Sequence, residues 1–128
     1  MSNLTPTEKT SVLGLEPYSR YAYSISQFAD SEVVYSLQRA DGGLAVAELD
    51  NQPFLSIWPH PEFAQTTGEQ QWPGYQVCNI PLADFTLSLL PSLDERILFN
   101  VFGIGDCTGF MVNQQELLRD IVAALNKY

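Results

Sequence analysis

The sequence predicts an α+β fold, in which a mixed, mainly antiparallel sheet of five or six strands packs with about four helices. Apolar residues recur at helical spacing in two long stretches, one after Pro17 and one after Asn113. Between them, short runs rich in β-branched and aromatic residues are separated by turn residues, which is typical of strands. Helices packed on such a sheet make up the α+β class.

The length of 128 residues is common for a single domain with its own core. Residues 1–15 are polar, rich in Ser and Thr and without periodicity, so we expect a flexible N-terminal tail there. Residues 16–128 are expected to form one α+β domain. No internal repeat divides this stretch.

The first half of the domain is expected to contain one helix followed by a three-stranded meander. Pro17 suits the first turn of a helix, and the apolar spacing predicts that helix over residues 17–30. Asp41-Gly42 predicts a tight hairpin turn between the first two strands, because both residues tolerate positive φ. The three predicted strands cover residues 32–39, 44–49 and 54–58.

The middle of the chain contains several prolines that end strands or begin helices. Pro59 ends the third strand, since proline cannot donate to a sheet. We expect a short helix from Pro61 with Gly68 as its stop, and then a loop over residues 69–75. A short strand is expected at 76–80, followed by a helix that Pro81 opens and Pro91 ends.

The last third predicts a central strand, a return strand and a terminal helix. Residues 96–102 are apolar on both faces, as in a strand covered on both sides, and 109–112 should pair back. Asn113 is a good N-cap, with Glu116 three residues later. The helix is expected to bury one apolar stripe, formed by Leu117, Leu118, Ile121, Val122 and Leu125.

The charge distribution limits the partners. The formal net charge is −9, and no Lys or Arg occurs from Ala40 to Glu95. Binding to nucleic acid or to an anionic membrane is disfavoured, because both need basic side chains. We expect either an acidity that serves solubility or an acidic face that binds a basic protein partner.

The cysteines and the start of the chain favour a cytoplasmic protein. Cys78 and Cys107 form no CxxC pair, which indicates two buried, reduced thiols. The first fifteen residues show no signal peptide, and no apolar run approaches the length of a membrane helix.

Few residues could support catalysis. His60 is the only histidine, so a small hydrolase or transferase would depend on His60, Glu62 and Cys78, although neither cysteine stands in a recognisable nucleophile motif. One histidine and two separated cysteines also make a metal site unlikely by ligand count, and no cofactor is expected. A non-enzymatic protein is therefore favoured, without excluding an enzyme.

The aromatic residues beside prolines are the candidate binding residues. Trp58, His60 and Glu62 lie in one segment, and Trp72 and Tyr75 lie in the next. We expect Trp58 to be structural, because it ends an apolar strand, and Trp72 to lie in a more exposed loop. The segments form either an aromatic-lined groove for a partner or small ligand, or an edge of the core.

Several segments, taken in their order along the chain, form a recognisable pattern. They are Arg20-Tyr21-Ala22-Tyr23, Val33-Val34-Tyr35-Ser36-Leu37, Trp58-Pro59-His60-Pro61-Glu62-Phe63-Ala64, Trp72-Pro73-Gly74-Tyr75, Ile80-Pro81-Leu82-Ala83-Asp84-Phe85, Leu90-Pro91-Ser92-Leu93 and the strand 98–102. On these segments the chain resembles the bacterial domain-of-unknown-function family 2750 over residues 18–128. Tyr35 departs from the resemblance, because the family often has tryptophan there. The resemblance implies a small bacterial protein and favours a shared structural or binding role for the Trp-Pro-His-Pro-Glu segment, but it implies no catalytic residues.

The sequence leaves three hypotheses for the function. The leading one is a protein-binding module for a basic partner, of which an immunity or inhibitor protein is one version. The alternatives are an enzyme that uses His60 and Glu62, and a small-ligand sensor whose pocket contains Trp58, Trp72 and Tyr75. The sequence identifies neither the ligand nor the oligomeric state.

Both cysteines are expected to carry free thiols, because they have no paired spacing and the chain shows no export signal. Thiol titration of denatured, non-reduced protein should therefore count both cysteines. A count near zero would contradict the cytoplasmic expectation.

Overall fold

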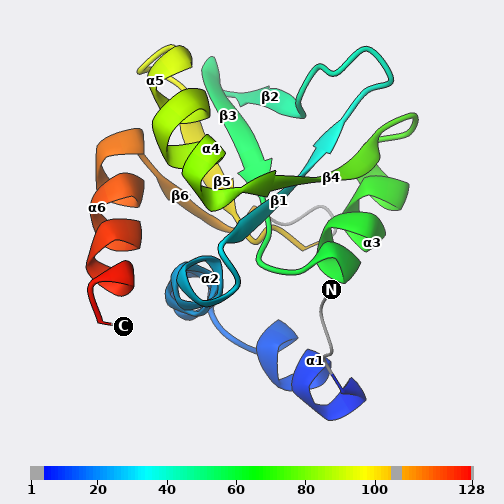
Figure 1. Cartoon of the computed structure of the whole chain (residues 1–128). Helices are drawn as coiled ribbons and strands as arrows, with labels where there is room; N and C mark the ends of the chain where they lie inside the picture. The colour runs from blue at the N-terminus through cyan, green and yellow to red at the C-terminus, as the bar shows by residue number, and fades with distance from the viewer. Residues whose placement is uncertain (1–4, 105–107, 128) are drawn as a thin grey trace.

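The larger sheet of the protein is mixed and has four strands. The computed structural model describes residues 5–104 and 108–127. Within them the strand order is β2-β3-β5-β6, with β3 and β5 parallel and the other neighbours antiparallel (Figure 1). The strands are β2 (Val46–Leu49), β3 (Gln52–Ile57), β5 (Leu98–Val101) and β6 (Phe110–Val112). The central strand and the return strand predicted in the last third are confirmed.

A second, two-stranded sheet pairs β1 (Val33–Gln38) with β4 (Gln76–Pro81) in antiparallel register. The α+β class and the six mainly antiparallel strands are confirmed, but the predicted meander is wrong at its first pairing. The turn after β1 forms, since the Arg39 N–H donates to the Gly43 carbonyl. Beyond Leu44 the chain bends, with the Val46 N–H bonded to the Leu44 carbonyl, so β2 leaves β1 and pairs only with β3.

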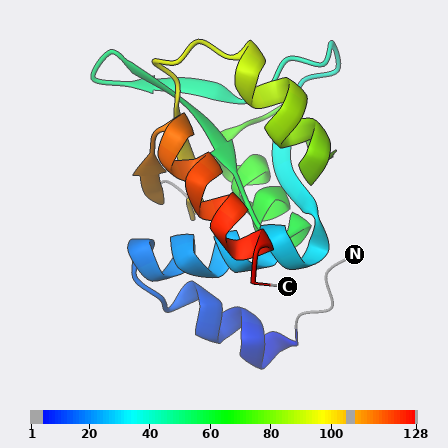
Figure 2. The same ribbon diagram turned by 60° about the vertical axis from the view of Figure 1, so that its left-hand side comes forward.

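Helices cover one face of the larger sheet. This face carries alternate residues of β3 and β5, and it is covered by α2 (Pro17–Ser31), α6 (Gln114–Leu125) and a helical stretch from Leu82 to Ser92 (Figure 2). The buried side chains of the two strands on this face are Leu55, Ile57, Phe99 and Val101. The opposite face is less covered, and it carries the candidate site.

The N-terminal segment is not an irregular tail. Residues Pro6–Leu13 form α1, although residues 1–15 were expected to lack structure. The hydroxyl of Thr5 accepts the Glu8 N–H, and the Glu8 carboxylate accepts the Thr5 N–H, which is a complete capping box. Val12 is the only buried residue of this helix, so its apolar periodicity is too weak to predict a helix.

The helix after Pro61 is longer than predicted. α3 spans Pro61–Gln71, so Gly68 lies within it and is not its stop. Gly68 packs against Leu37 of β1, and a β-carbon there would lie 3.0 Å from the Leu37 Cδ2 atom. The glycine thus permits close packing of α3 on β1. The predicted loop at 69–75 is correspondingly shortened by the end of α3.

The stretch from Leu82 to Ser92 consists of three helical segments, of which the middle one is a π-helix. It begins as α4 (Leu82–Asp84), widens to the π-helix η1 (Phe85–Leu89) and ends as α5 (Leu90–Ser92). Pro81 is the last residue of β4, so it does not begin the helix as predicted. The wider π turn precedes Pro91, whose ring would clash with a carbonyl in a regular α-helix.

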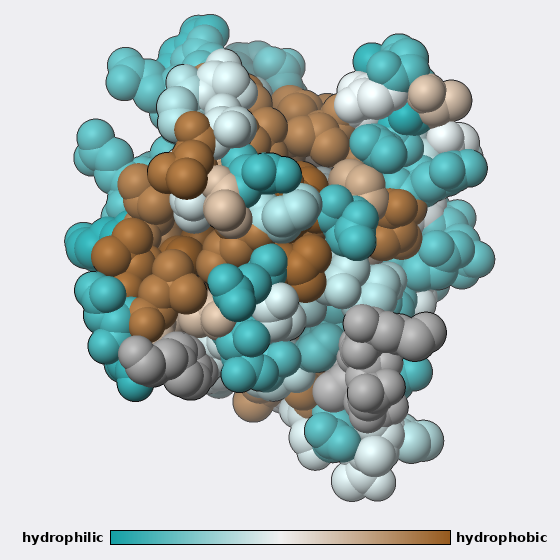
Figure 3. Space-filling model, in the orientation of Figure 1, coloured by the Kyte–Doolittle hydropathy of each residue, from teal (hydrophilic) through white to brown (hydrophobic). Residues whose placement is uncertain are grey.

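α6 forms as predicted but buries only part of its apolar stripe. Asn113 caps it and accepts the Glu116 N–H at 2.8 Å. Leu117 and Ile121 are fully buried, whereas the remaining apolar residues are partly exposed. Leu118, Val122 and Leu125 are exposed apolar side chains of α6. The surface over α6, at the left of Figure 3, is largely apolar.

Candidate functional site

Trp58 continues from β3 into a buried position at the base of the candidate site. Its side chain is only 1% exposed, and its indole N–H donates to the Gly103 carbonyl at 2.8 Å. Its backbone exchanges two hydrogen bonds with Tyr35 of β1, which joins the two sheets. Trp58 is therefore anchored in the core, and its contribution to stability stays a prediction.

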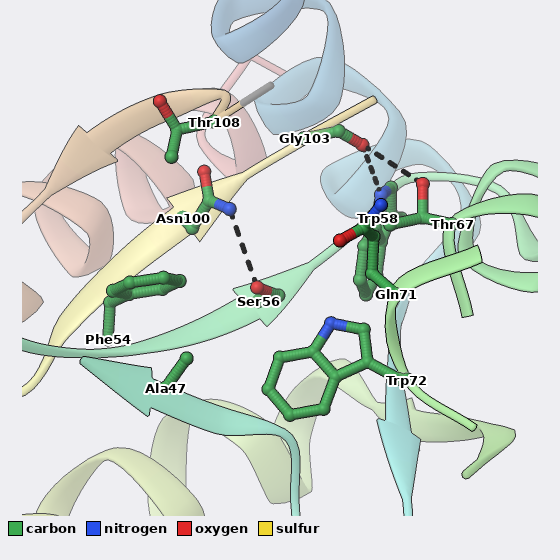
Figure 4. A pocket seen from close by; sticks show the side chains of 10 residues that line it. All are labelled: Ala47, Phe54, Ser56, Trp58, Thr67, Gln71, Trp72, Asn100, Gly103 and Thr108. Carbon is green, nitrogen blue, oxygen red and sulfur yellow. Dashed lines mark hydrogen bonds between the residues drawn. The ribbon is translucent and has the colours of Figure 1, made fainter. Parts of the chain in front are cut away.

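A cavity of about 330 Å³ lies on the less covered face of the larger sheet (Figure 4). Its floor comes from β2, β3 and β5, one wall comes from α3, and another comes from the segment after β5. The lining residues are Ala47, Phe54, Ser56, Trp58, Thr67, Gln71, Trp72, Asn100, Gly103 and Thr108. The volume lies at the lower end of the range for small-ligand pockets, about 300–1,000 Å³.

The floor of the cavity has two buried polar side chains on adjacent strands. Ser56 and Asn100 are register partners in the parallel pair, so their side chains emerge on the same face. The Asn100 amide donates to the Ser56 hydroxyl at 3.4 Å, and its carbonyl oxygen accepts the Gly109 N–H at 2.7 Å. The second bond fixes the orientation of the amide, so its NH₂ group is directed toward Ser56 and the cavity (Figure 4).

The α3 wall contributes Thr67, Gln71 and Trp72. Trp72 is the residue after the helix, and its N–H donates to the Gly68 carbonyl. Its side chain is half-buried and meets Tyr75 edge-on at 5.0 Å. Trp72 is therefore the first residue of the loop after α3, which is shorter than the predicted loop at 69–75, and Tyr75 supports the indole from outside the cavity lining.

The described part of the cavity lining is uncharged. It combines aromatic and aliphatic surface with the hydroxyls and amides of Ser56, Thr67, Thr108, Gln71 and Asn100. Among the lining residues within 5–104 and 108–127, none has an acidic or basic side chain, although the chain as a whole is strongly acidic. These described residues offer stacking and hydrogen bonds to a ligand.

His60 and Glu62 do not line this cavity. His60 is buried at the start of α3, and its Nε2 atom lies 2.6 Å from the Tyr23 hydroxyl of α2. Burial lowers the pKa of His60, against the opposing effect of Glu62 and Glu8. Burial also raises the pKa of Tyr23, and the same two carboxylates add to that rise. Both partners are thus held in their neutral forms at pH 7.

Glu62 lies near this pair, whereas Cys78 lies on another element. Glu62 acts on the pKa of both His60 and Tyr23, and its Oε1 atom is buried and has no hydrogen-bond partner among the described residues. Cys78 is on β4 and lines a different groove, and burial raises the pKa of its thiol, which reduces the reactive thiolate. Cys107 lies outside the described residues. Within those residues, no hydrogen bond links the Cys78 thiol to His60 or Glu62.

Within residues 5–104 and 108–127, no three His, Cys, Asp or Glu side chains come together in a way that would hold a metal ion. None of the helices in the same ranges combines the length and the apolar character that crossing a membrane requires.

The two polar residues on the floor of the cavity were not predicted from the sequence as site residues. Ser56 interrupts the apolar run Phe54–Trp58, and Asn100 interrupts the apolar run of the central strand. Both are buried, with exposures of 3% and 6%. A polar residue inside a continuously apolar strand is a signal of a buried polar contact or a ligand site. Thr67 and Gln71 carry no comparable signal, because polar residues are common in helices.

The comparison with known families agrees with the motifs. The family model described as "Protein of unknown function (DUF2750)" matches residues 21–121, and the chain belongs to this family. The resemblance predicted from the sequence is thereby confirmed. The match covers every cavity-lining residue and leaves out α1. No curated protein matches the chain.

Truncation of the two tryptophans should have unequal effects on stability. Trp58→Ala removes a fully buried side chain and is expected to cost about 3–5 kcal/mol, whereas Trp72→Ala should cost about 1–2 kcal/mol because the side chain is half-buried. Urea denaturation of both variants measures the difference. Equal, large losses would show that Trp72 is as much a core residue as Trp58.

Stability should fall as the pH falls from about 7 to 5. The unfolded chain takes up a proton on histidine at about pH 6.5, whereas the pKa of His60 in the folded protein is lower. The contribution of His60 to the free energy of unfolding is therefore complete above about pH 6.5 and declines below it. His60→Gln keeps a hydrogen-bonding group for Tyr23 and does not titrate, so its profile should be flatter. Urea midpoints at several pH values measure this, and parallel profiles would contradict it.

Proposed function

We propose that this member of the DUF2750 family is a non-enzymatic binding module whose cavity binds a small, uncharged ligand with a planar ring. The observation that supports the proposal is the composition of the lining. An indole and two hydrogen-bonding strand residues meet in one recess, and none of the lining residues that the structure describes is charged. This combination suits recognition by stacking and hydrogen bonds.

Trp72 is the proposed stacking surface. It is half-buried, so one part of the indole is fixed by the protein while another part borders the cavity (Figure 4). Tyr75 packs edge-on against it and limits its rotation. Stacking of a heteroaromatic ring on an aromatic side chain contributes about 1–3 kcal/mol. A preformed indole incurs little ordering cost when the ligand arrives.

Asn100 and Ser56 are the proposed polar contacts. The Asn100 amide is oriented by the Gly109 N–H, which leaves its NH₂ group directed toward the recess. The Ser56 hydroxyl accepts from this amide and also has a hydrogen that it can donate. A ligand with hydrogen-bond acceptors on its ring edge would satisfy this pair of donors. A ligand without them would leave buried polar groups unpaired, which provides specificity.

An enzyme that uses His60 and Glu62 is the weaker proposal. The Tyr23–His60 pair could in principle transfer a proton, but the pKa of Tyr23 is raised and that of His60 is lowered. These shifts oppose formation of the tyrosinate–imidazolium pair that such a transfer needs. The same shifts suit a buried structural hydrogen bond between α2 and the start of α3.

The proposal includes a cytoplasmic location. It is supported by the two cysteines, which are expected to remain reduced, and by the half-buried thiol of Cys78.

The experiment is a thermal-unfolding screen with uncharged nucleobases, nucleosides and monosaccharides, compared with their phosphorylated forms. An uncharged ring compound should raise the melting temperature in proportion to ln(1 + [L]/Kd), and its phosphate should not. Gln71→Ala, on the exposed rim, should weaken the shift and leave the ligand-free melting temperature unchanged. A panel in which only charged compounds stabilise the protein would contradict the proposal.

A further inference from the structure

β4 is an edge strand with unpaired backbone groups. It pairs with β1 on one side only, and the structure gives it no second neighbour among the described residues. Tyr35 of β1 is the register partner of Asn79, yet both backbone groups of Tyr35 bond to Trp58. Tyr35 and Asn79 are therefore a non-bonded pair, and the N–H and carbonyl groups of Asn79 are directed away from β1.

The same alternation applies to Val77. Bonded and non-bonded pairs alternate along an antiparallel ladder, so residues two apart on β4 share a direction. The register partner of Val77 is Leu37, whose carbonyl accepts from Ala45 on the far side of β1. Val77 and Asn79 thus present two N–H groups and two carbonyls along the open edge. Neither N–H bonds to another described residue.

A groove of about 590 Å³ lies beside β4. Residues 77–80 of β4 line it, together with Gln38 at the end of β1 and with Gly42 and Leu44 of the turn that follows. The opposite wall is the helical stretch at 82–92, through Asp84, Ser88, Leu89 and Ser92. The groove therefore extends from β4 to the end of β1, and it leaves space next to β4 for the side chains of an added strand.

The charge near the groove favours a basic occupant. Asp84 is exposed and lines the groove, and no Lys or Arg is among the lining residues. Glu32 is exposed where β4 ends, since its carbonyl accepts the Leu82 N–H. The nearest cation in the sequence, Arg39, forms an ion pair with Asp41 at 3.3 Å. Lysine or arginine side chains of a bound segment would meet uncompensated acids here.

We propose that β4 binds an extended, basic segment of a partner protein, which adds to the two-stranded sheet as a third strand. The backbone of the segment would pair with Val77 and Asn79, and its cationic side chains would face Asp84. This surface is separate from the tryptophan cavity, because no residue lines both. Pro81 limits the added strand at one end, since it has no N–H to contribute.

The test uses a synthetic peptide of alternating lysine and valine and a matched peptide of alternating glutamate and valine. The lysine peptide should bind the wild-type protein and slow the amide exchange of Val77 and Asn79, and the glutamate peptide should do neither. Asn79→Pro removes an outward N–H without breaking the pairing with β1, so it should weaken binding about three- to tenfold. Asn79→Ala keeps that N–H and should bind within about twofold of wild type.

The controls separate strand addition from general attraction to an acidic protein. Equal affinity of the proline and alanine variants, with no protection of the two amides, would overturn the proposal, and so would equal binding of both peptides. If Asn79→Pro does not fold, the amide exchange of the wild-type protein still decides between the outcomes. Trp72→Ala should leave peptide binding unchanged, because Trp72 lies in the other site.

Discussion

The packing of the other elements depends on the sharp bend at Phe102 and Gly103, directly after β5. Phe102 is fully buried with φ at 63°, an unfavourable backbone conformation for a bulky residue. Its N–H bonds to β3 and its carbonyl accepts from Arg20 of α2, at 2.9 and 3.3 Å. The next carbonyl, that of Gly103, accepts from Trp58 and from Thr67 of α3. One bend thus joins the sheet to α2 and α3, and the cavity depends on it because Trp58, Thr67 and Gly103 all line it.

The elements that were predicted correctly are those with strong local signals. Pro17 with a regular apolar stripe defines α2, and Asn113 with Glu116 defines the start of α6. The missed helix α1 has a capping box, but it packs by one buried side chain, so its pattern resembles a tail. The pairing of β1 with β4 joins residues about forty positions apart. Turn residues determine hairpins between neighbours, and they say nothing about such distant partners.

Only part of the candidate site was predicted, because local sequence signals do not show which distant segments lie side by side. Aromatic residues beside prolines marked Trp58 and Trp72 as positioned side chains, and both line the cavity. Tyr75 is adjacent in sequence and supports the indole, while His60 turns toward α2 instead. Closeness in the sequence therefore did not show which residues line the cavity and which ones only support a lining residue. Ser56 and Asn100 come from strands 44 residues apart, and only the parallel register of β3 and β5 brings them together.

The two proposed surfaces are connected by a short piece of chain. Trp72 follows α3 and lines the cavity, and β4 begins at Gln76 after a turn in which Gly74 has φ at 87°. α3 also packs closely on β1 through Gly68, and β1 is the partner of β4. The close approach of α3 to β1 thus positions a wall of the cavity and supports the strand that pairs with β4, so both surfaces depend on the absence of a side chain at Gly68.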